Sequence, residues 1–253
     1  MEHCNPVQNP IIPGCKLFQD ENEVVVNVTY YRKLVGNMMY ITTTRPDIVF
    51  VVHLLNKYMS RPTKLHLLVA KRVLSYLQGT SDFGLFYKKN GNNELIGYTD
   101  SDYAGDIEDR KSTSGYVFIL SLAAVAWSSQ KQPIVTLSTT KAEFVAVAAC
   151  STQAIWMKRI LSTLGYQGDE RTIIFCDNSS TIQLARNPVF HARSKHIEVR
   201  FHFLRDLENN GIVQLVHCGT NDQVVDVLTK PLKLETFRKM RERLGVCKVP
   251  VVN

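Results

Sequence analysis

Apolar residues in the first third of the chain recur at the three- and four-residue spacing that is typical of amphipathic helices. The pattern predicts one helix from Tyr30, a second that opens at Pro46, and a third that follows Pro62 and ends at Gly79. Proline suits the first position of a helix because that position needs no amide hydrogen bond. Three prolines lie close together before Tyr30, so we expect this lead-in to be extended and poorly packed.

Short apolar runs alternate with helical patterns beyond a polar connector at residues 89–93. The predicted strands are Gly84–Lys88, just before the connector, and then Leu95–Asp100, Thr113–Leu120, Ala123–Ser129, Thr172–Cys176 and Ile212–His217. The predicted helices are Ser138–Leu164, Ser179–Ala185, His196–Leu207 and a last one, Asp222–Lys230, before Pro231. This order predicts an α/β domain with one mixed sheet. We therefore divide the chain into a mainly helical segment (1–93), an α/β domain (94–247) and a tail (248–253).

Four acidic residues lie at the ends of predicted elements. Asp100 ends one strand and Asp177 follows another, while Glu143 and Asp226 lie in the first turns of helices. Taken alone, Asp100 is more simply a turn residue after a strand. If the four met at one sheet edge, however, they would need cations, because like charges raise one another's pKa. Oxygen ligands favour Mg²⁺ or Mn²⁺, and two such ions can activate a water and stabilise the leaving oxygen in phosphodiester cleavage.

The composition is that of an ordinary globular protein with a modest excess of positive charge. The 253 residues are 45% hydrophobic and 21% charged, with a formal net charge of +7, which suits an anionic partner such as nucleic acid. No apolar run reaches the roughly 18 residues of a membrane span, so we expect no membrane partner. Residues 1–15 are too polar for a signal peptide. The six cysteines are widely spaced, so we expect reduced thiols in an intracellular protein, without a zinc site.

Several short motifs follow one another along the chain. They are Tyr98–Asp106, Asp109–Tyr116, Leu137–Phe144, Cys176–Ser180, Ser194–Arg200 and Asp226–Pro231. Together they resemble the RNase H domain at the end of a copia-type retrotransposon polyprotein. The stretch from Tyr31 to Ile48 resembles the end of the reverse transcriptase that precedes RNase H in that polyprotein. The resemblance implies an RNase H-like α/β fold, with a mixed central sheet flanked by helices, after a mainly helical reverse-transcriptase connection segment.

By this resemblance, the chain is expected to be an endoribonuclease that hydrolyses the RNA strand of RNA–DNA hybrids during reverse transcription. Asp100, Glu143, Asp177 and Asp226 match the family's catalytic acids, which bind two Mg²⁺ or Mn²⁺ ions, with Asp100 shared between both. The products would carry a 3′-hydroxyl and a 5′-phosphate. The implied partners are the hybrid and a reverse-transcriptase polymerase domain in cis within a polyprotein. The implied location is a cytoplasmic particle, the nucleus or both.

Other polar residues are candidates for contact with a nucleic acid. They are Arg110, Lys111, Ser112, Ser129, Lys131, Asn178 and His217. A plain solvated hairpin explains the first five about equally well, and a strand-end histidine is the simpler interpretation of His217. Asp102 and Asp106 could support the metal ligands or simply form a turn. Core positions are the simpler interpretation of Trp127 and Cys176.

Three histidines resemble a zinc cluster only in composition. They are His191, His196 and His202. The last two are six residues apart and do not share a helix face, so a solvated surface is the simpler interpretation.

One position departs from the family's pattern, because Lys141 stands where the family usually has glutamate. Ser138 is a plausible helix N-cap, and glutamate at position 141 would complete a capping box that lysine cannot make. Lysine also places a positive charge at the positive end of the helix dipole, near Glu143, where we expect it to weaken metal binding.

Two alternative functions remain open. Lys141 and the absence of a Tyr-x-Asp-Asp polymerase motif are compatible with a catalytically inactive or decayed fragment that acts only as a hybrid-binding or structural domain. A DNA-strand-transferring enzyme such as an integrase has the same broad fold. It is disfavoured because the chain has no His/Cys zinc module and because its last acid, Asp226, is not a glutamate.

Overall fold

The computed structural model describes residues 4–20, 22–88, 94–166, 171–186 and 195–249. The helices are α1 (Val28–Ile41), α2 (Val49–Asn56), α3 (Lys64–Gln78), α4 (Thr139–Thr163), α5 (Ser179–Arg186), α6 (Lys195–Asn209), α7 (Asp226–Thr229) and α8 (Leu234–Arg243). The strands are β1 (Phe83–Leu85), β2 (Ile96–Ser101), β3 (Thr113–Leu120), β4 (Ala123–Lys131), β5 (Thr172–Cys176), β6 (Val213–His217) and β7 (Val246–Lys248). Short 3₁₀ turns precede α2 (Pro46–Ile48) and α7 (Thr220–Asp222). Among the described residues, no helix is both long and apolar enough to cross a membrane.

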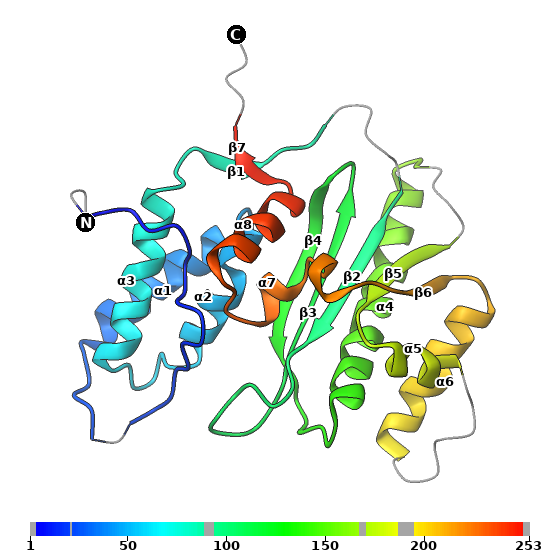
Figure 1. The fold of residues 1–253 in the computed structure, drawn as a ribbon, viewed down its shortest axis with the longest axis horizontal. Coiled ribbons are helices and arrows are strands. Elements are labelled where there is room, and N and C mark those ends of the chain that lie inside the picture. Colours follow the sequence, from blue (N-terminus) through cyan, green and yellow to red (C-terminus); the bar gives the residue numbers. More distant parts are fainter. Residues whose placement is uncertain (1–3, 21, 89–93, 167–170, 187–194, 250–253) are drawn as a thin grey trace.

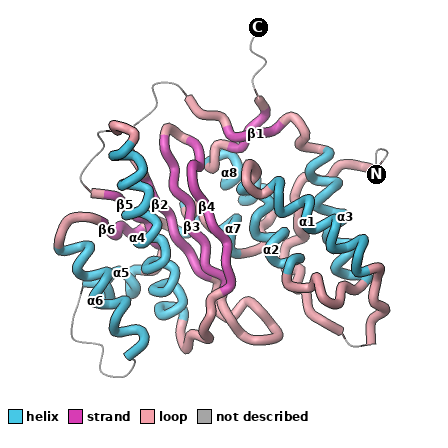
Figure 2. Tube along the Cα trace, turned by 180° about the vertical axis from the view of Figure 1, so that it is seen from behind, coloured by secondary structure: helices cyan, strands magenta, loops and turns pink. Residues whose placement is uncertain are grey.

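The central sheet has five strands in the order β4-β3-β2-β5-β6. Strands β2, β3 and β4 run antiparallel to one another, whereas β2, β5 and β6 run parallel. Helices α4, α5 and α6 lie on one side of this sheet, and α7, α8 and the N-terminal helices lie on the other (Figures 1 and 2). A mixed sheet flanked by helices confirms the predicted α/β class with one mixed central sheet.

The N-terminal segment forms the three predicted helices. Their apolar faces are buried, with Tyr31, Val35 and Met38 of α1 fully enclosed. Pro46 occupies the first position of the 3₁₀ turn that leads into α2, as expected from its fixed φ angle. The lead-in before α1 is largely irregular, but the prediction that it packs poorly was wrong. The side chain of Leu17 is almost completely buried, because the lead-in runs across the helices and supplies apolar contacts to their core.

A charged network is buried among these helices. The guanidinium of Arg45 donates to both carboxylate oxygens of Asp47, over 2.8 and 2.7 Å, and also to the carbonyl and hydroxyl oxygens of Thr80. The hydroxyl of Tyr76 donates to Asp47 Oδ2 at 2.5 Å, and Arg241 from α8 donates to that hydroxyl at 3.3 Å. The motif that resembles a reverse-transcriptase tail therefore supplies a polar centre that joins α3 to α8.

Two hydrophobic cores lie on opposite sides of the sheet. One, between the sheet and α4–α6, includes Phe118 and Phe144. The other joins the N-terminal helices to residues far along the chain, among them Leu228 of α7 and Met240 of α8. Strand β1 also pairs with β7 in a separate two-stranded sheet. Residues before 93 thus share a core with the end of the chain, and the division at residue 93 stays a prediction.

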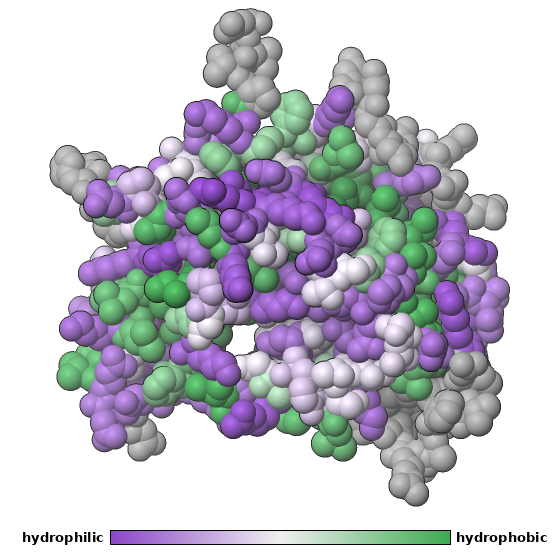
Figure 3. All heavy atoms as spheres, viewed as in Figure 1, coloured by the Kyte–Doolittle hydropathy of each residue, from purple (hydrophilic) through white to green (hydrophobic). Residues whose placement is uncertain are grey.

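The C-terminal part differs most from the sequence prediction. The prediction of one helix over Asp222–Lys230 was wrong. A 3₁₀ turn occupies Thr220–Asp222, and within the rest of the predicted range only the four residues of α7 are helical. Helix α8 and strand β7 were not predicted. The charged residues of α8 hide its helical pattern, because only Phe237, Met240 and Arg241 of the helix are buried. Figure 3 shows hydrophilic side chains gathered over α7 and α8 on this face.

Candidate active site

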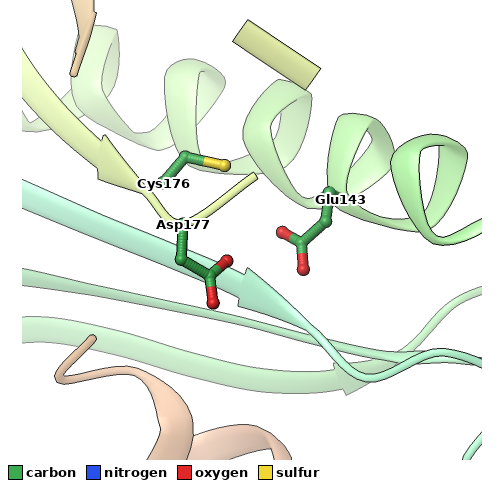
Figure 4. Close-up of side chains that lie close together, drawn as sticks. All are labelled: Glu143, Cys176 and Asp177. Carbon is green, nitrogen blue, oxygen red and sulfur yellow. The ribbon is translucent and has the colours of Figure 1, made fainter. Parts of the chain in front are cut away.

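The four predicted acids come from four different elements. Asp100 lies near the end of β2 and Asp177 directly follows β5, so these two acids share one sheet edge because the two strands are parallel neighbours. Asp226 begins α7, and Glu143 lies in the first turns of α4. Carboxylate oxygens of Asp100, Asp177 and Asp226 lie within 4.8 Å of one another. The carboxylates of Glu143 and Asp177 face each other near the end of β2 (Figure 4).

Three of the four acids are unusually enclosed for charged groups, whereas Asp177 is half-buried. The exposed fractions are 2% for Asp100, 6% for Glu143 and 4% for Asp226. The hydroxyl of Thr229 donates to Asp100 Oδ2, and the backbone N–H of Ser101 donates to Glu143 Oε1 at 3.1 Å. Glu143 Oε2 is buried without a hydrogen-bond partner among the described residues. Such an oxygen is costly to bury unless a further group binds it.

The electrostatics of the cluster are repulsive. Burial raises the pKa of Glu143, of Asp177 and of Asp226 above the usual range of carboxyl groups. The nearby carboxylate of Asp100 is the second cause in each case and raises these pKa values further. A divalent cation would offset both effects, since it supplies positive charge and ligand bonds to the buried carboxylates. The all-oxygen donor set and the unpaired Glu143 oxygen fit a hard cation such as Mg²⁺ or Mn²⁺.

Cys176 lies beside Glu143 and Asp177, and its sulfur is close enough to share a metal ion with them. Its side chain nevertheless points toward α4 (Figure 4). Burial raises the pKa of the Cys176 thiol well above its usual range. Cys176 is fully buried in the hydrophobic core between the sheet and α4–α6, in line with the sequence interpretation of a small core residue.

A glycine allows α7 to lie close to the sheet. Gly115 of β3 stands opposite Asp100 in the strand register. A Cβ atom at position 115 would lie 2.7 Å from Val225 Cγ1 and 2.9 Å from Thr229 Cγ2, closer than carbon atoms pack. Gln223, just before α7, also donates from Nε2 to the carbonyl oxygen of a β2 residue at 2.8 Å. The bare backbone of Gly115 therefore lets α7 bring its carboxylate beside that of Asp100.

Lys230, whose positively charged side chain lies beside the acids, was not identified from the sequence. Its Nζ atom lies 2.9 Å from Asp226 Oδ1 and 3.7 Å from Asp100 Oδ2. The spacing was visible in the last motif, because a lysine four residues after an aspartate meets it on the surface of a helix.

Lys141, the residue expected to disturb the site, forms no ion pair with a carboxylate among the described residues. Its backbone N–H donates to Ser138 Oγ at 3.3 Å, which confirms Ser138 as the N-cap of α4. Residues two apart on a helix point in different directions, so Lys141 does not face Glu143 along the helix. Among the residues that the structure describes, the basic side chain in ion-pair contact with the acids is that of Lys230.

The candidate substrate-binding residues do not form one group. Ser112 and Ser129 are buried, and Ser112 Oγ accepts a backbone N–H within its own loop. Asn178 Oδ1 accepts a backbone N–H of α5 at 3.0 Å and so holds the start of that helix. His217 is exposed at the end of β6, in register with the residue before Asp177. Of these four, His217 alone combines exposure with a place beside the acids, and a role in binding substrate stays a prediction for all of them.

The remaining candidates belong to the loop between β2 and β3 and to the strand beside it. Arg110 is exposed with a left-handed backbone (φ +56°), and Lys111 is half-buried. Asp102 accepts the backbone N–H of Thr113, which fixes the loop. The contact of Asp102 agrees with a role in forming the turn. None of these observations places Arg110 or Lys111 beside the four acids.

Trp127 and the histidines follow their simpler interpretations where the structure describes them. The ring N–H of Trp127 donates to the carbonyl oxygen of Thr42 at 3.1 Å, and the side chain packs against the N-terminal core. His202 is exposed on α6. His191 lies outside the described residues, as does the side chain of His196.

A cluster of ion pairs joins the loop between β2 and β3 to the N-terminal segment. Lys57, just after α2, lies 2.6 Å from Asp106 Oδ2, and Lys131 of β4 lies 2.5 Å from the same oxygen. The two lysines also pair with Glu108 and Asp109, respectively. Lys131 is therefore engaged in a structural contact. Asp106 is a bridging residue at the base of the loop.

Asp106→Asn is expected to reduce stability in a pH-dependent way. Partial burial alone would raise the pKa of Asp106, but hydrogen bonds from Lys131 and Lys57 outweigh it and hold the pKa well below its usual range. A depressed pKa stabilises the fold above the unfolded value of about 3.9, and this contribution is lost as the pH falls through the folded value. We expect the variant to lose about 1 kcal/mol of unfolding free energy near pH 7.

Urea unfolding at several pH values measures this effect. The gap between the variant and the unsubstituted chain should shrink below about pH 4. Asp206→Asn, at an exposed position of α6, is the control and should show no such gap. A gap of constant size across the pH range would contradict the assignment.

Comparison with known proteins places the chain in a family. No family model matches it. It is similar to the retrovirus-related Pol polyprotein from transposon RE1 of Arabidopsis thaliana, with 40% identity over 97% of this chain and 17% of the relative. The corresponding polyprotein from transposon RE2 of the same plant is 41% identical over the same shares. The chain thus spans about 17% of the length of these curated relatives.

Solved structures show a looser likeness. The N-terminal RNase H domain of a Mycobacterium tuberculosis protein matches with a TM-score of 0.41 and 10% identity, over 60% of this chain and 98% of the solved chain. The family assignment therefore rests on the sequence relatives, which align with nearly the whole chain. The chain belongs to the retrovirus-related Pol polyproteins of copia-type retrotransposons.

Proposed function

We propose that the chain is a ribonuclease H that cleaves the RNA strand of RNA–DNA hybrids with two divalent cations. The observation that carries the proposal is the meeting of carboxylates from β2, β5 and α7 within 4.8 Å, with Glu143 of α4 beside them. Four acids are not needed to stabilise a fold, because burying them together is unfavourable without cations. Their convergence is explained by a reaction that uses such cations.

The chain's own side chains would hold and orient the metal ions. Asp100 would bind both ions, and Glu143, Asp177 and Asp226 would complete the set. When bound, the two ions would activate a water and neutralise the charge on the leaving oxygen. Thr229 fixes the orientation of Asp100, and the backbone N–H of Ser101 fixes that of Glu143. Enclosure of the acids keeps their electrostatic interactions strong.

The same proposal extends to substrate, partners and organisation. The RNA strand would be distinguished from DNA by its 2′-hydroxyl groups, and cleavage would leave a 3′-hydroxyl and a 5′-phosphate. Residues 94–247 would form the RNase H domain, followed by a tail at 248–253. Residues 1–93 would form the connection to a reverse-transcriptase polymerase domain in cis. The protein would act inside the cell, in a particle or the nucleus, where reverse transcription takes place.

Cleavage of a labelled RNA–DNA hybrid tests this proposal. The purified chain with Mg²⁺ or Mn²⁺ should cut the RNA strand, whereas Asp177→Asn should lose at least about a hundredfold in rate because one metal ligand becomes neutral. The control is Asp222→Asn, the same change at a position that is 63% exposed by its side chain and pairs with Arg243. It should cleave like the unsubstituted chain.

The alternative of a non-catalytic domain gives a different result in the same assay. It predicts no cleavage above the Asp177→Asn background, together with retained binding of the hybrid. That combination would overturn the enzymatic proposal. Analysis of the cleaved ends completes the test, because a 3′-phosphate would contradict the metal-dependent mechanism.

A further inference from the structure

Lys230 has no role in the mechanism proposed above, although it lies at its centre. Its ammonium group contacts two of the acids, Asp226 at 2.9 Å and Asp100 at 3.7 Å. Both carboxylates are almost fully buried, with side-chain exposures of 6% and 3%. A buried carboxylate needs a cation or several hydrogen-bond donors to remain charged. Among the described residues, Lys230 is the one basic side chain that forms ion pairs with these acids.

We propose that Lys230 is a built-in counter-ion that holds the acid cluster together in the metal-free protein and competes with a divalent cation for Asp100 and Asp226. The inference rests on the proposed function, because it takes these acids to be metal ligands. In the metal-free state the ammonium partly neutralises three mutually repelling carboxylates. When a divalent cation binds, the ammonium gives up its contacts with the shared oxygens.

The position of Lys230 on the chain suits such an exchange. Lys230 is the C-cap residue of α7 and is followed by Pro231, which favours the extended backbone that Lys230 has. Its side chain is 38% exposed, in contrast to the enclosed acids. It also borders a cleft of about 240 Å³ between residues 14–17 and Asp102. The flexible four-carbon stem can therefore carry the ammonium group from the acids toward solvent without a backbone movement.

The spacing of the charges predicts a large effect on metal affinity. A divalent cation must displace the ammonium group from the carboxylate oxygens, and the loss of these ion pairs in a partly enclosed site weakens the net binding of the cation. Loss of the ammonium charge should therefore tighten divalent metal binding by at least about tenfold. The same loss leaves the acids without their counter-ion when no metal is present, so the metal-free protein should become less stable.

The test measures metal binding and metal-free stability, and the hybrid-cleavage assay described above separates this inference from the proposed function. Binding of Mn²⁺ is titrated by electron paramagnetic resonance of the free ion, and the melting temperature is measured in a chelator. Lys230→Met removes the charge and keeps the length of the side chain. Lys230→Gln also removes the charge but keeps a hydrogen-bond donor for Asp226, so it serves if the Met variant folds poorly. The control is Lys233→Met, which removes the same charge at an exposed position three residues away.

We expect both Lys230 variants to bind Mn²⁺ at least about tenfold more tightly than Lys233→Met and to melt at a lower temperature without metal. If the difference in Mn²⁺ affinity or the difference in melting temperature is absent while Mn²⁺ still binds, the inference about Lys230 is overturned and the proposed function stands. If none of the proteins binds Mn²⁺, both are overturned. If both differences appear but no variant or parent cleaves the hybrid, the inference stands and the proposed function fails.

Discussion

Asp100→Asn is expected to abolish cleavage of the RNA–DNA hybrid while it raises the melting temperature of the metal-free protein. Asparagine keeps the shape of the side chain, and its oxygen can still accept a hydrogen bond from the hydroxyl of Thr229. It removes one negative charge from an almost fully buried site that also contains Asp177 and Asp226. Relief of this repulsion should stabilise the fold by about 1 kcal/mol, or about 2–4 °C for a chain of this size.

The loss of activity should be large because Asp100 is the proposed ligand of both ions. A fall on the order of a thousandfold or more in cleavage rate is expected. Thermal denaturation in a chelator and single-turnover cleavage measure the two effects, with Asp222→Asn as the neutral control. A variant that cleaves like the parent would show that Asp100 is not a metal ligand. A variant that is less stable than the parent would show that the ion pair between Asp100 and Lys230 outweighs the repulsion among the acids.

Asp47→Ala is expected to cause the largest loss of stability. Its carboxylate accepts two hydrogen bonds from Arg45 and one from Tyr76 in a fully buried network. Removing it leaves the Arg45 guanidinium charged and enclosed without its anion. Breaking such a pair typically costs about 3–5 kcal/mol, so the melting temperature should fall by about 10 °C or more.

Two comparisons isolate the cause. Asp82→Ala breaks an ion pair with Lys248 on the surface, where both side chains are largely exposed, and should leave the melting temperature nearly unchanged. The double variant Arg45→Met with Asp47→Leu removes both buried charges and should be more stable than Asp47→Ala alone. Thermal denaturation of all four proteins checks this order. A double variant as unstable as the single one would show that lost packing, not the unpaired charge, dominates.

The parts of the fold that could be predicted are those with a clear local signal. The bounds of β3 and β5 match the prediction at both ends, because each is an apolar run limited by polar or turn-forming residues. Helix α8 and strand β7 lack that signal. Most residues of α8 are charged, and β7 is three residues long. They exist because they cover α7, β1 and the N-terminal core, which are contacts with distant parts of the chain.

The candidate site shows the same limit. The four acids could be selected because each stands at the end of an element and matches a family motif. The contact of Lys230 with the acids could not be predicted in this way, since it depends on how α7 lies against the sheet. That placement depends in turn on Gly115, whose missing side chain makes room for Thr229 and Val225. Lys141 drew attention because it departs from the family pattern, yet a sequence departure does not show which way a side chain points.

The pairing of β1 with β7 also determines when the protein can finish folding. Leu85 pairs with Val246, about 160 residues later in the chain. At the usual rate of translation, about 5–20 residues per second, the N-terminal helices leave the ribosome about ten to thirty seconds before their last partners. During that interval the apolar residues that later contact α7 and α8 lack these contacts, which favours aggregation of the nascent chain.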